Sequence, residues 1–268
     1  MSNASPQTAI LVDGVSMVYQ SKNGAGQRIV ALDRMGFSVE QGEIVSVLGP
    51  NGCGKSTLLL VAAGLLAPTT GTITYPLQHA RNSPHRMGVV FQDYGLFHWM
   101  TVRQNIEFVL KPLGHSPSER QTIVQKFIDV VGLRGFEIAY PRQLSGGMQQ
   151  RAAIARALAI SPEFLFLDEP FASLDLQTRD ILQEEFLRIW EIDRATTLFV
   201  THSIEEAIYL SHKVIVLTGR PGSVKQTFPV LFDHPRSPDL RLKTDFLNLK
   251  ASIWSSLREE IDINKEKA

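Results

Sequence analysis

The sequence predicts an α/β protein with a mainly parallel core sheet, an antiparallel β layer near the N-terminus and an inserted α-helical subdomain. Short apolar strands alternate with helices over residues 164–217, which is typical of a parallel sheet covered by helices. Two runs with strand-like alternation, 10–19 and 29–39, are joined by a Gly-containing turn and predict the antiparallel layer. Residues from about 92 to 160 are mainly helical in character, so we expect the helical subdomain there.

The individual elements follow from local patterns. The apolar run 44–48 predicts a buried strand and 56–63 a helix, followed by a turn, a short strand over 72–75 and a polar loop over 76–86. Within the helical part we expect helices that begin near Thr101, at Ser116 and at Ser145. Ser116 is a capping residue followed by Pro117, and the helix after Ser145 is rich in alanine. The remaining elements are expected as strands at 87–91, 164–167, 196–200 and 214–217 and helices at 176–192, 204–210 and 239–261.

Composition limits the class of protein. The 268 residues are 44 % hydrophobic and 20 % charged, which predicts a packed core. Lys+Arg and Asp+Glu both number 27, so net charge gives no reason to expect a nucleic-acid or anionic-membrane surface. There is no signal peptide and no run of about 18 apolar residues, so we expect a cytosolic protein that docks to any membrane through a partner. We expect a loose arm at 1–8, a main domain at 9–233 and a helical tail at 234–268, with helical spacing of Leu240, Leu247, Trp254 and Leu257.

A phosphate-binding loop lies between the predicted strand 44–48 and the helix after it. Its pattern is Gly, four residues, Gly, Lys and Ser. Glycines let backbone amides turn toward phosphate oxygens, Lys55 would reach the β- and γ-phosphates, and the Ser56 hydroxyl would bind Mg²⁺. The alternative is a Gly-rich turn with a surface lysine. The loop consists of Gly49, Pro50, Asn51, Gly52, Cys53, Gly54, Lys55, Ser56 and Thr57.

Cys53 is the only cysteine, so an internal disulfide is impossible and a reducing compartment is expected. The thiol is either a reactive group or simply a small side chain in a tight loop.

Two carboxylates end the apolar strand 164–167. Asp168 would help to hold Mg²⁺, and Glu169 would orient or deprotonate the attacking water, the two tasks that phosphoryl transfer requires. The alternative is an exposed acidic pair at the end of a strand.

A second anion-binding helix start is predicted at Ser145, Gly146 and Gly147. One phosphate loop already holds one side of a triphosphate. The helix start at Ser145 would therefore bind a different phosphate, or the phosphate that another molecule holds. The alternative is an ordinary Ser-capped helix.

Taken in order, these motifs resemble the ATP-binding subunit of an ATP-binding-cassette (ABC) importer, over about residues 10–230. The resemblance implies a P-loop NTPase fold, with 49–57 as Walker A, 144–149 as the signature motif, 164–169 as Walker B and 173–175 as the D-loop. It identifies Gln92 as the Q-loop residue, His202 as the switch histidine and Tyr19 as the aromatic that stacks on adenine. Without the order of these motifs, each residue has an ordinary structural interpretation. Gln92 would be a polar loop residue, His202 a structural histidine, and Tyr19 a side chain that packs within its strand.

The resemblance also implies cofactors and roles. ATP and Mg²⁺ are the expected cofactors, with Lys55, Glu169 and His202 catalytic and with Ser56, Gln92 and Asp168 as metal ligands. Met148 stands where the family commonly has Gln, so contacts to the ribose differ. Residues 169–175, 201–210 and 214–222 are similar to the nitrate, sulfonate and taurine importer branch.

The expected partners are a second copy packed head to tail, membrane permease subunits and indirectly a solute-binding protein, with no nucleic acid. The expected location is peripheral, on the cytoplasmic face of the plasma membrane. A permease helix would dock beside Gln92 and 93–100, where Phe97, His98, Trp99 and Met100 are either a docking surface or core.

The rival hypotheses are an ABC ATPase acting on DNA or ribosomes and a phosphate-binding scaffold without catalysis. A single cassette without heptads argues against the first, and the complete set of motifs argues against the second.

Overall fold

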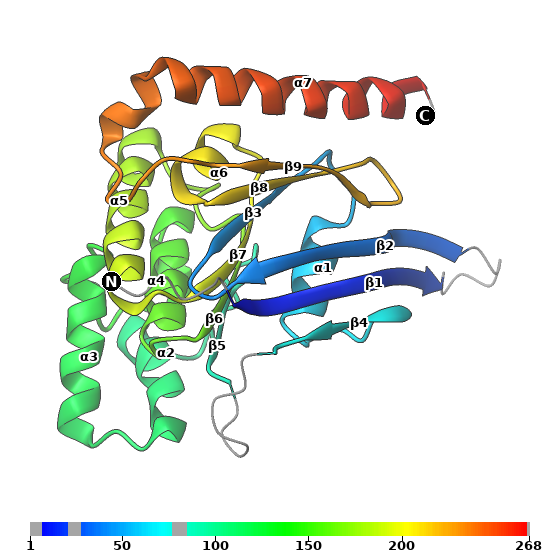
Figure 1. Cartoon of the computed structure of the whole chain (residues 1–268). Coiled ribbons are helices and arrows are strands. Elements are labelled where there is room, and N and C mark those ends of the chain that lie inside the picture. Colours follow the sequence, from blue (N-terminus) through cyan, green and yellow to red (C-terminus); the bar gives the residue numbers. More distant parts are fainter. Residues whose placement is uncertain (1–6, 21–27, 77–84, 267–268) are drawn as a thin grey trace. The chain divides into compact units, whose positions relative to one another are not determined.

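The computed structural model describes residues 7–20, 28–76 and 85–266 (Figure 1). Most of the predicted N-terminal arm, the turn 21–27 and most of the loop 76–86 lie outside these ranges. The chain divides into two compact units, residues 1–83 with 196–268 and residues 84–195. The helical insertion predicted at about 92–160 lies within the second unit.

The first unit contains the predicted antiparallel layer. Strands β1 (Thr8–Gln20), β2 (Arg28–Glu40) and β4 (Thr70–Thr74) pair in the order β2-β1-β4, with every pairing antiparallel. Alternating side chains of β1, including Ile10 and Val12, are buried, as the sequence pattern requires.

The same unit carries a group of parallel strands. β3 (Ile44–Leu48) lies between β7 (Thr196–Val200) and β8 (Lys213–Leu217), parallel to both. Every residue of β3 and β7 is buried, which explains why these strands are mostly apolar and do not alternate between polar and apolar residues. β9 (Val224–Pro229) pairs antiparallel with β8 and was not predicted, because Phe228 is its only buried residue.

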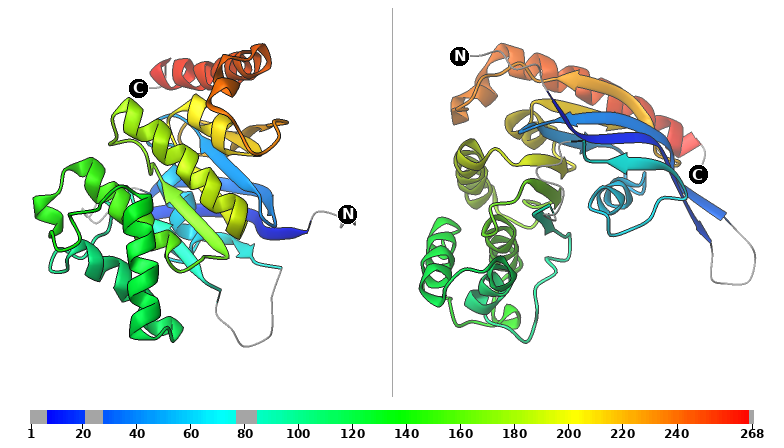
Figure 2. Two further views of the ribbon diagram at one scale, coloured as in Figure 1. Left: turned by 90° about the vertical axis from the view of Figure 1, so that its left-hand side faces the viewer. Right: turned by 60° about the horizontal axis from the view of Figure 1, so that its bottom comes forward.

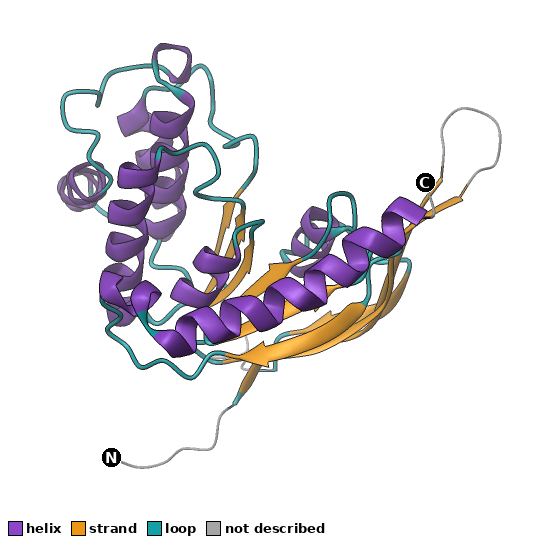
Figure 3. Ribbon diagram, turned by 90° about the horizontal axis from the view of Figure 1, so that it is seen from above, coloured by secondary structure: helices purple, strands orange, loops and turns teal. Residues whose placement is uncertain are grey.

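The helices of the first unit are α1 (Lys55–Ala62), α6 (Ile204–Leu210), η3 (Pro238–Leu242) and α7 (Thr244–Glu266). Helix α7 contacts α6 and β8 and lies beside the β8–β9 hairpin (Figures 1 and 3).

The buried face of the last helix contains both apolar and polar residues. Helix α7 buries Phe246, Ile253, Ser256, Leu257 and Glu260. Of the residues whose spacing predicts the helix, Leu240 and Leu257 are buried, whereas Leu247 and Trp254 are 50 % and 52 % exposed.

The second unit contains the remaining helices and one pair of strands. Helices α2, α3 and α4 contact one another (green in Figure 2), and α4 also contacts β5. Capping hydroxyls begin α2 and α3: Thr101 and Ser116 each form a capping box with the residue three positions on. The elements are β5 (Met87–Val90), α2 (Val102–Leu110), η1 (Lys111–Leu113), α3 (Pro117–Val130), η2 (Pro141–Gln143), α4 (Gly146–Leu158), β6 (Phe164–Asp168) and α5 (Leu176–Asp193), with β5 and β6 parallel.

The turn between β8 and β9 lies against the backbone of two other segments. Gly222 donates its N–H to the carbonyl of Ala31 at 3.0 Å, and its own carbonyl accepts the N–H of Asp33 at 2.8 Å. A Cβ atom at Gly222 would lie 2.0 Å from the carbonyl oxygen of Cys53. This obstacle is a backbone atom, which cannot move aside as the end of a flexible side chain can. The turn therefore fits against the loop 49–57 only with glycine at this position.

We therefore expect Gly222→Ala to lower the melting temperature by roughly 3–10 °C, since overpacking against backbone destabilises. Gly36→Ala is the matched control, because a Cβ there meets only one backbone oxygen at 4.0 Å. Calorimetric melting of both variants is the measurement. Equal melting temperatures for the two variants would contradict this account of the turn.

Candidate functional site

The loop 49–57 connects β3 to α1 and adopts a bend that glycine makes possible. Gly54 is the N-cap of α1 and has φ of 98°, in the left-handed region. No side chain caps this helix start. The first amides of an α-helix lack intrahelical partners, so the start of α1 is suited to an anion.

Lys55 lies folded back onto the loop that precedes it. Its Nζ atom donates to the carbonyl oxygens of Gly49 at 2.8 Å and Pro50 at 3.0 Å, and the residue is only 6 % exposed. The lysine is therefore not the surface residue of the alternative interpretation; its ammonium group is held at the centre of the loop.

Cys53 is fully buried beside Lys55. Burial raises the pKa of the thiol, and the nearby lysine only partly offsets this effect. A buried thiol with a raised pKa is a poor nucleophile. The structure therefore favours the interpretation of Cys53 as a small side chain in a tight loop.

Tyr19 and His202 lie near this loop within the same unit. The hydroxyl of Tyr19 forms a 3.2 Å hydrogen bond with Oγ1 of Thr57, and the ring is 38 % exposed. His202 is exposed and lines a cavity together with residues 49–52. The first unit thus brings Tyr19, the phosphate loop and His202 together.

Polar contacts fix the backbone on both sides of His202. Thr201 donates its hydroxyl to Oε2 of Glu206 at 2.6 Å and accepts the N–H of Ser203 at 3.0 Å. Ser203 in turn caps α6 by accepting the N–H of Glu206 at 3.2 Å. These contacts hold the turn that presents the histidine.

Asp168 and Glu169 end strand β6 in the second unit. Asp168 is 6 % exposed, and Glu169 has φ of 51°, a left-handed conformation that is strained for a side chain of this kind. The backbone therefore turns sharply at Glu169. The side chain of Asp168 is buried, whereas Glu169 is half-buried.

Gln150 holds this turn in place and was not assigned from the sequence. Its Nε2 atom donates to the carbonyl of Glu169 at 2.8 Å, and its Oε1 atom accepts the N–H of Ser173 at 3.3 Å. The side chain is 1 % exposed. One buried amide on α4 thus connects the residues after β6 with the segment 173–175. A polar residue among buried alanines is the only sequence signal of this role.

A Ser-capped helix start is present at the position of the predicted second anion site. Ser145 precedes α4, is exposed, and accepts the N–H of Met148 at 3.3 Å. Gly146 and Gly147 form the first turn of the helix. Because the serine caps the third amide, the amides of the two glycines are the ones suited to an external anion.

Gln92 follows β5, is exposed, and begins a loop that a buried arginine holds. Arg156 of α4 donates to the carbonyls of Gly95 at 2.7 Å and Tyr94 at 3.2 Å. Burial lowers the pKa of Arg156, and no carboxylate contributes to this shift. Sequence reasoning missed Arg156, since its role depends on contacts more than 60 residues away in the chain.

The segment 97–100 divides between core and surface. The Phe97 ring packs at 4.9 Å from the Phe108 ring and 5.4 Å from the Trp99 ring. Trp99 is 71 % exposed, and His98 is also exposed. Asn105 anchors the segment, since its side chain accepts the N–H of Phe97 at 2.8 Å and donates back to its carbonyl at 3.2 Å. Phe97 is therefore half-buried against its aromatic neighbours, whereas Trp99 is mainly exposed.

The site residues thus form two groups. The first unit holds Tyr19, residues 49–57 and His202, and the second holds Gln92, residues 145–147 and the pair Asp168 and Glu169.

The proposed metal ligands Ser56, Gln92 and Asp168 all offer oxygen atoms, which suits Mg²⁺. Within the described residues no cluster of three or more His, Cys, Asp or Glu side chains could hold a metal by itself.

Comparison with known proteins identifies the family. Residues 32–172 match the ABC transporter family. An uncharacterised ABC transporter ATP-binding protein of Methanocaldococcus jannaschii is 48 % identical over 236 residues, 88 % of this chain and 87 % of that one. The nitrate import ATP-binding protein NrtD of Synechocystis is 45 % identical over 92 % of this chain and 94 % of its own. An aliphatic sulfonates import ATP-binding protein, SsuB of Bacillus cereus, is 40 % identical over 85 % and 88 %.

A solved structure agrees in fold. A dimeric ATP-binding cassette in a post-hydrolysis state, bound to ADP and phosphate, covers 84 % of this chain and 100 % of its own, with a TM-score of 0.74 and 28 % identity. The sequence resemblance and the α/β fold class are thereby confirmed. The chain belongs to the ABC transporter family, as one of its ATP-binding and ATP-hydrolysing subunits.

Proposed function

We propose that this subunit energises the uptake of a small anionic solute, such as nitrate, a sulfonate or a taurine-like compound, through a membrane permease. The cargo proposal rests on one observation, the similarity over nearly the whole chain to ATP-binding proteins named for nitrate and sulfonate import. The cargo itself is not expected to touch this subunit.

In the proposed nucleotide site, the phosphates of ATP replace the backbone carbonyls that Lys55 now contacts. An ammonium group gains more from the phosphate charge than from two neutral carbonyls, so the exchange is favourable. Tyr19 would stack on the adenine. Ser56, Gln92 and Asp168 would hold Mg²⁺, which neutralises charge on the β- and γ-phosphates when it is bound.

For hydrolysis, we assign Glu169 to the attacking water and His202 to the γ-phosphate. The left-handed turn at Glu169 and the hydrogen bond from Gln150 to its carbonyl support this assignment, because strained and reinforced backbone is typical of catalytic positions. Phosphoryl transfer depends on such positioning and on charge neutralisation.

Ser145, Gly146 and Gly147 would bind the phosphate held by a second copy of the chain. Two copies packed head to tail would then enclose two ATP molecules, and closure of this dimer would drive transport. The related cassette bound to ADP and phosphate is described as a dimer. Hydrolysis would reopen the dimer and reset the cycle.

The permease would dock beside Gln92 and residues 93–100, where Trp99 offers an exposed apolar side chain. The subunit would then lie peripherally on the cytoplasmic face of the membrane, served by a solute-binding protein on the other side. No helix among residues 7–20, 28–76 and 85–266 has the length and apolar character to cross a bilayer.

Replacing Glu169→Gln should leave ATP binding intact and lower turnover by about 10²–10⁴-fold, because the amide cannot act as a base. The variant should accumulate as an ATP-bound dimer. Phosphate release and sedimentation with ATP are the measurements. Glu184→Gln on the outer helix α5 is the matched control. Turnover within about twofold of the unsubstituted protein would reject Glu169 as the base.

Ser145→Asp and Ser145→Asn test the proposed phosphate contact at α4. Both residues are good helix caps, so both variants should keep the melting temperature. The aspartate carboxylate would repel phosphate and should lower ATP turnover roughly tenfold or more, equivalent to about 1.4 kcal/mol, whereas asparagine should be tolerated. Equal activity of the two variants would mean that no phosphate approaches Ser145.

A further inference from the structure

A cavity of about 690 Å³ lies between helix α7, His202 and the first residues of the phosphate loop. Trp254, Leu257 and Ile261 line it from α7, and residues 48–52 line it from the loop. Ile204 adds a further apolar side chain. The volume is within the range of about 300–1,000 Å³ that is usual for sites that bind small molecules.

This cavity adjoins the site that we propose for ATP, because His202 and residues 49–52 also line it. Lys55, Ser56 and Tyr19 are not among the residues that line it. One wall is formed by α7, which lies outside the residues that match the family.

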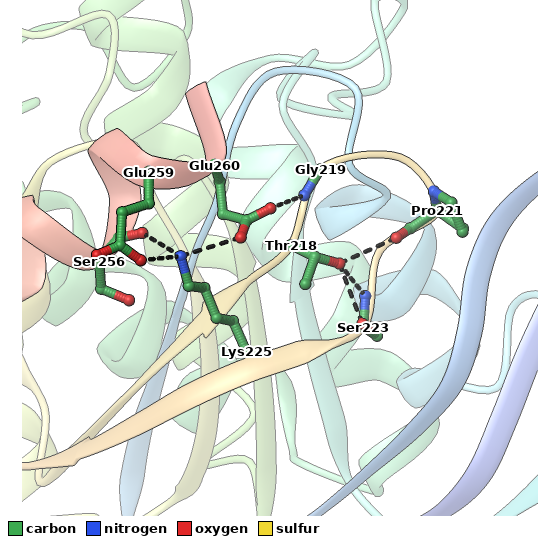
Figure 4. A network of polar contacts seen from close by, with 8 residues as sticks. All are labelled: Thr218, Gly219, Pro221, Ser223, Lys225, Ser256, Glu259 and Glu260. Atoms are coloured by element: carbon green, nitrogen blue, oxygen red, sulfur yellow. Dashed lines mark hydrogen bonds and ion pairs between the residues drawn. The ribbon is translucent and has the colours of Figure 1, made fainter. Parts of the chain in front are cut away.

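A polar network holds α7 against the β8–β9 hairpin and so keeps this wall in place (Figure 4). Lys225 of β9 forms ion pairs with Glu259 at 2.8 Å and Glu260 at 2.9 Å, and it donates to the carbonyl of Ser256 at 2.9 Å. Glu260 is 8 % exposed and also accepts the N–H of Gly219 at 2.9 Å. Because the acceptors lie on successive turns of α7, they fix the helix along its axis.

Arg220 supplies a cationic group to the cavity. It follows Gly219, the residue that Glu260 holds, and its side chain is among those that line the cavity. It is exposed, and no residue in the described part of the chain forms a hydrogen bond or ion pair with it. A guanidinium group without an internal partner can bind an oxyanion through two N–H groups.

We propose that this cavity binds an organic anion with an aromatic or aliphatic body and a sulfonate or carboxylate head group. The head group binds Arg220, and the body packs against Trp254, Leu257 and Ile261. An apolar cavity with one convergent charge favours such a ligand over a fully polar one and over a neutral hydrocarbon. The ligand also contacts Pro50 and Asn51, and so reaches the phosphate loop next to the site that we propose for ATP.

The test is calorimetric titration of the full chain with naphthalene-2-sulfonate and, in parallel, with the uncharged naphthalene-2-sulfonamide. The unsubstituted protein should bind one sulfonate per chain and should prefer it to the sulfonamide by roughly tenfold. Arg220→Met should remove that preference and leave sulfonamide binding unchanged. Trp254→Ala should weaken the binding of both compounds.

Two controls separate this site from general effects. Arg34→Met removes an arginine whose side chain is 84 % exposed elsewhere in the same unit and should leave sulfonate binding unchanged. Lys55→Ala removes the phosphate-binding cation and should also leave it unchanged, whether or not ATP turnover is lost.

Three results would overturn the proposal. They are the absence of saturable sulfonate binding, an Arg220→Met affinity within about twofold of the original, and loss of sulfonate binding in Lys55→Ala. The last would place the anion in the phosphate loop. Because binding is measured without ATP, the result does not depend on the proposed transport function.

Discussion

The charge of a bound triphosphate is the constraint on which the rest of this structure depends. Lys55 and the start of α1 can neutralise that charge from one side only. A second helix start with backbone amides suited to an anion follows Ser145, and it lies in the other compact unit of the chain. We propose that each copy supplies half of two sites, so that closing a site and bringing two copies together are one event. Transport can be driven by ATP because the ligand itself completes the interface.

Buried polar side chains hold the residues of the site without contacting the nucleotide. Gln150 holds the turn at Glu169, Arg156 holds the loop after Gln92, and Thr201 with Glu206 holds the turn at His202. Each bond ends on a backbone group or a neighbouring side chain within its own unit. This arrangement fixes the positions on which phosphoryl transfer depends.

The sequence predicted most of the fold because its signals are local. The apolar, β-branched composition of β3 and β7, the capping box at Ser116 and the motif order were sufficient for the strands, the helices and the family. The misses depend on tertiary contacts. Strand β9 is polar and is recognisable only through its pairing with β8. Arg156 and Gln150 could not be assigned, because their carbonyl partners are distant in the chain.

The claim that each copy holds half a site is tested most directly by mixing two variants that are each expected to lower ATP turnover. Lys55→Ala removes the phosphate-binding cation, and Ser145→Asp adds a repelling charge at the opposite half. In a dimer of one of each, both defects fall in one site and the other site is intact. An equimolar mixture should therefore recover up to about a quarter of the original ATP turnover, since half of its dimers are mixed and each has one intact site. Turnover equal to that of the separate variants, with subunit exchange verified, would contradict the account.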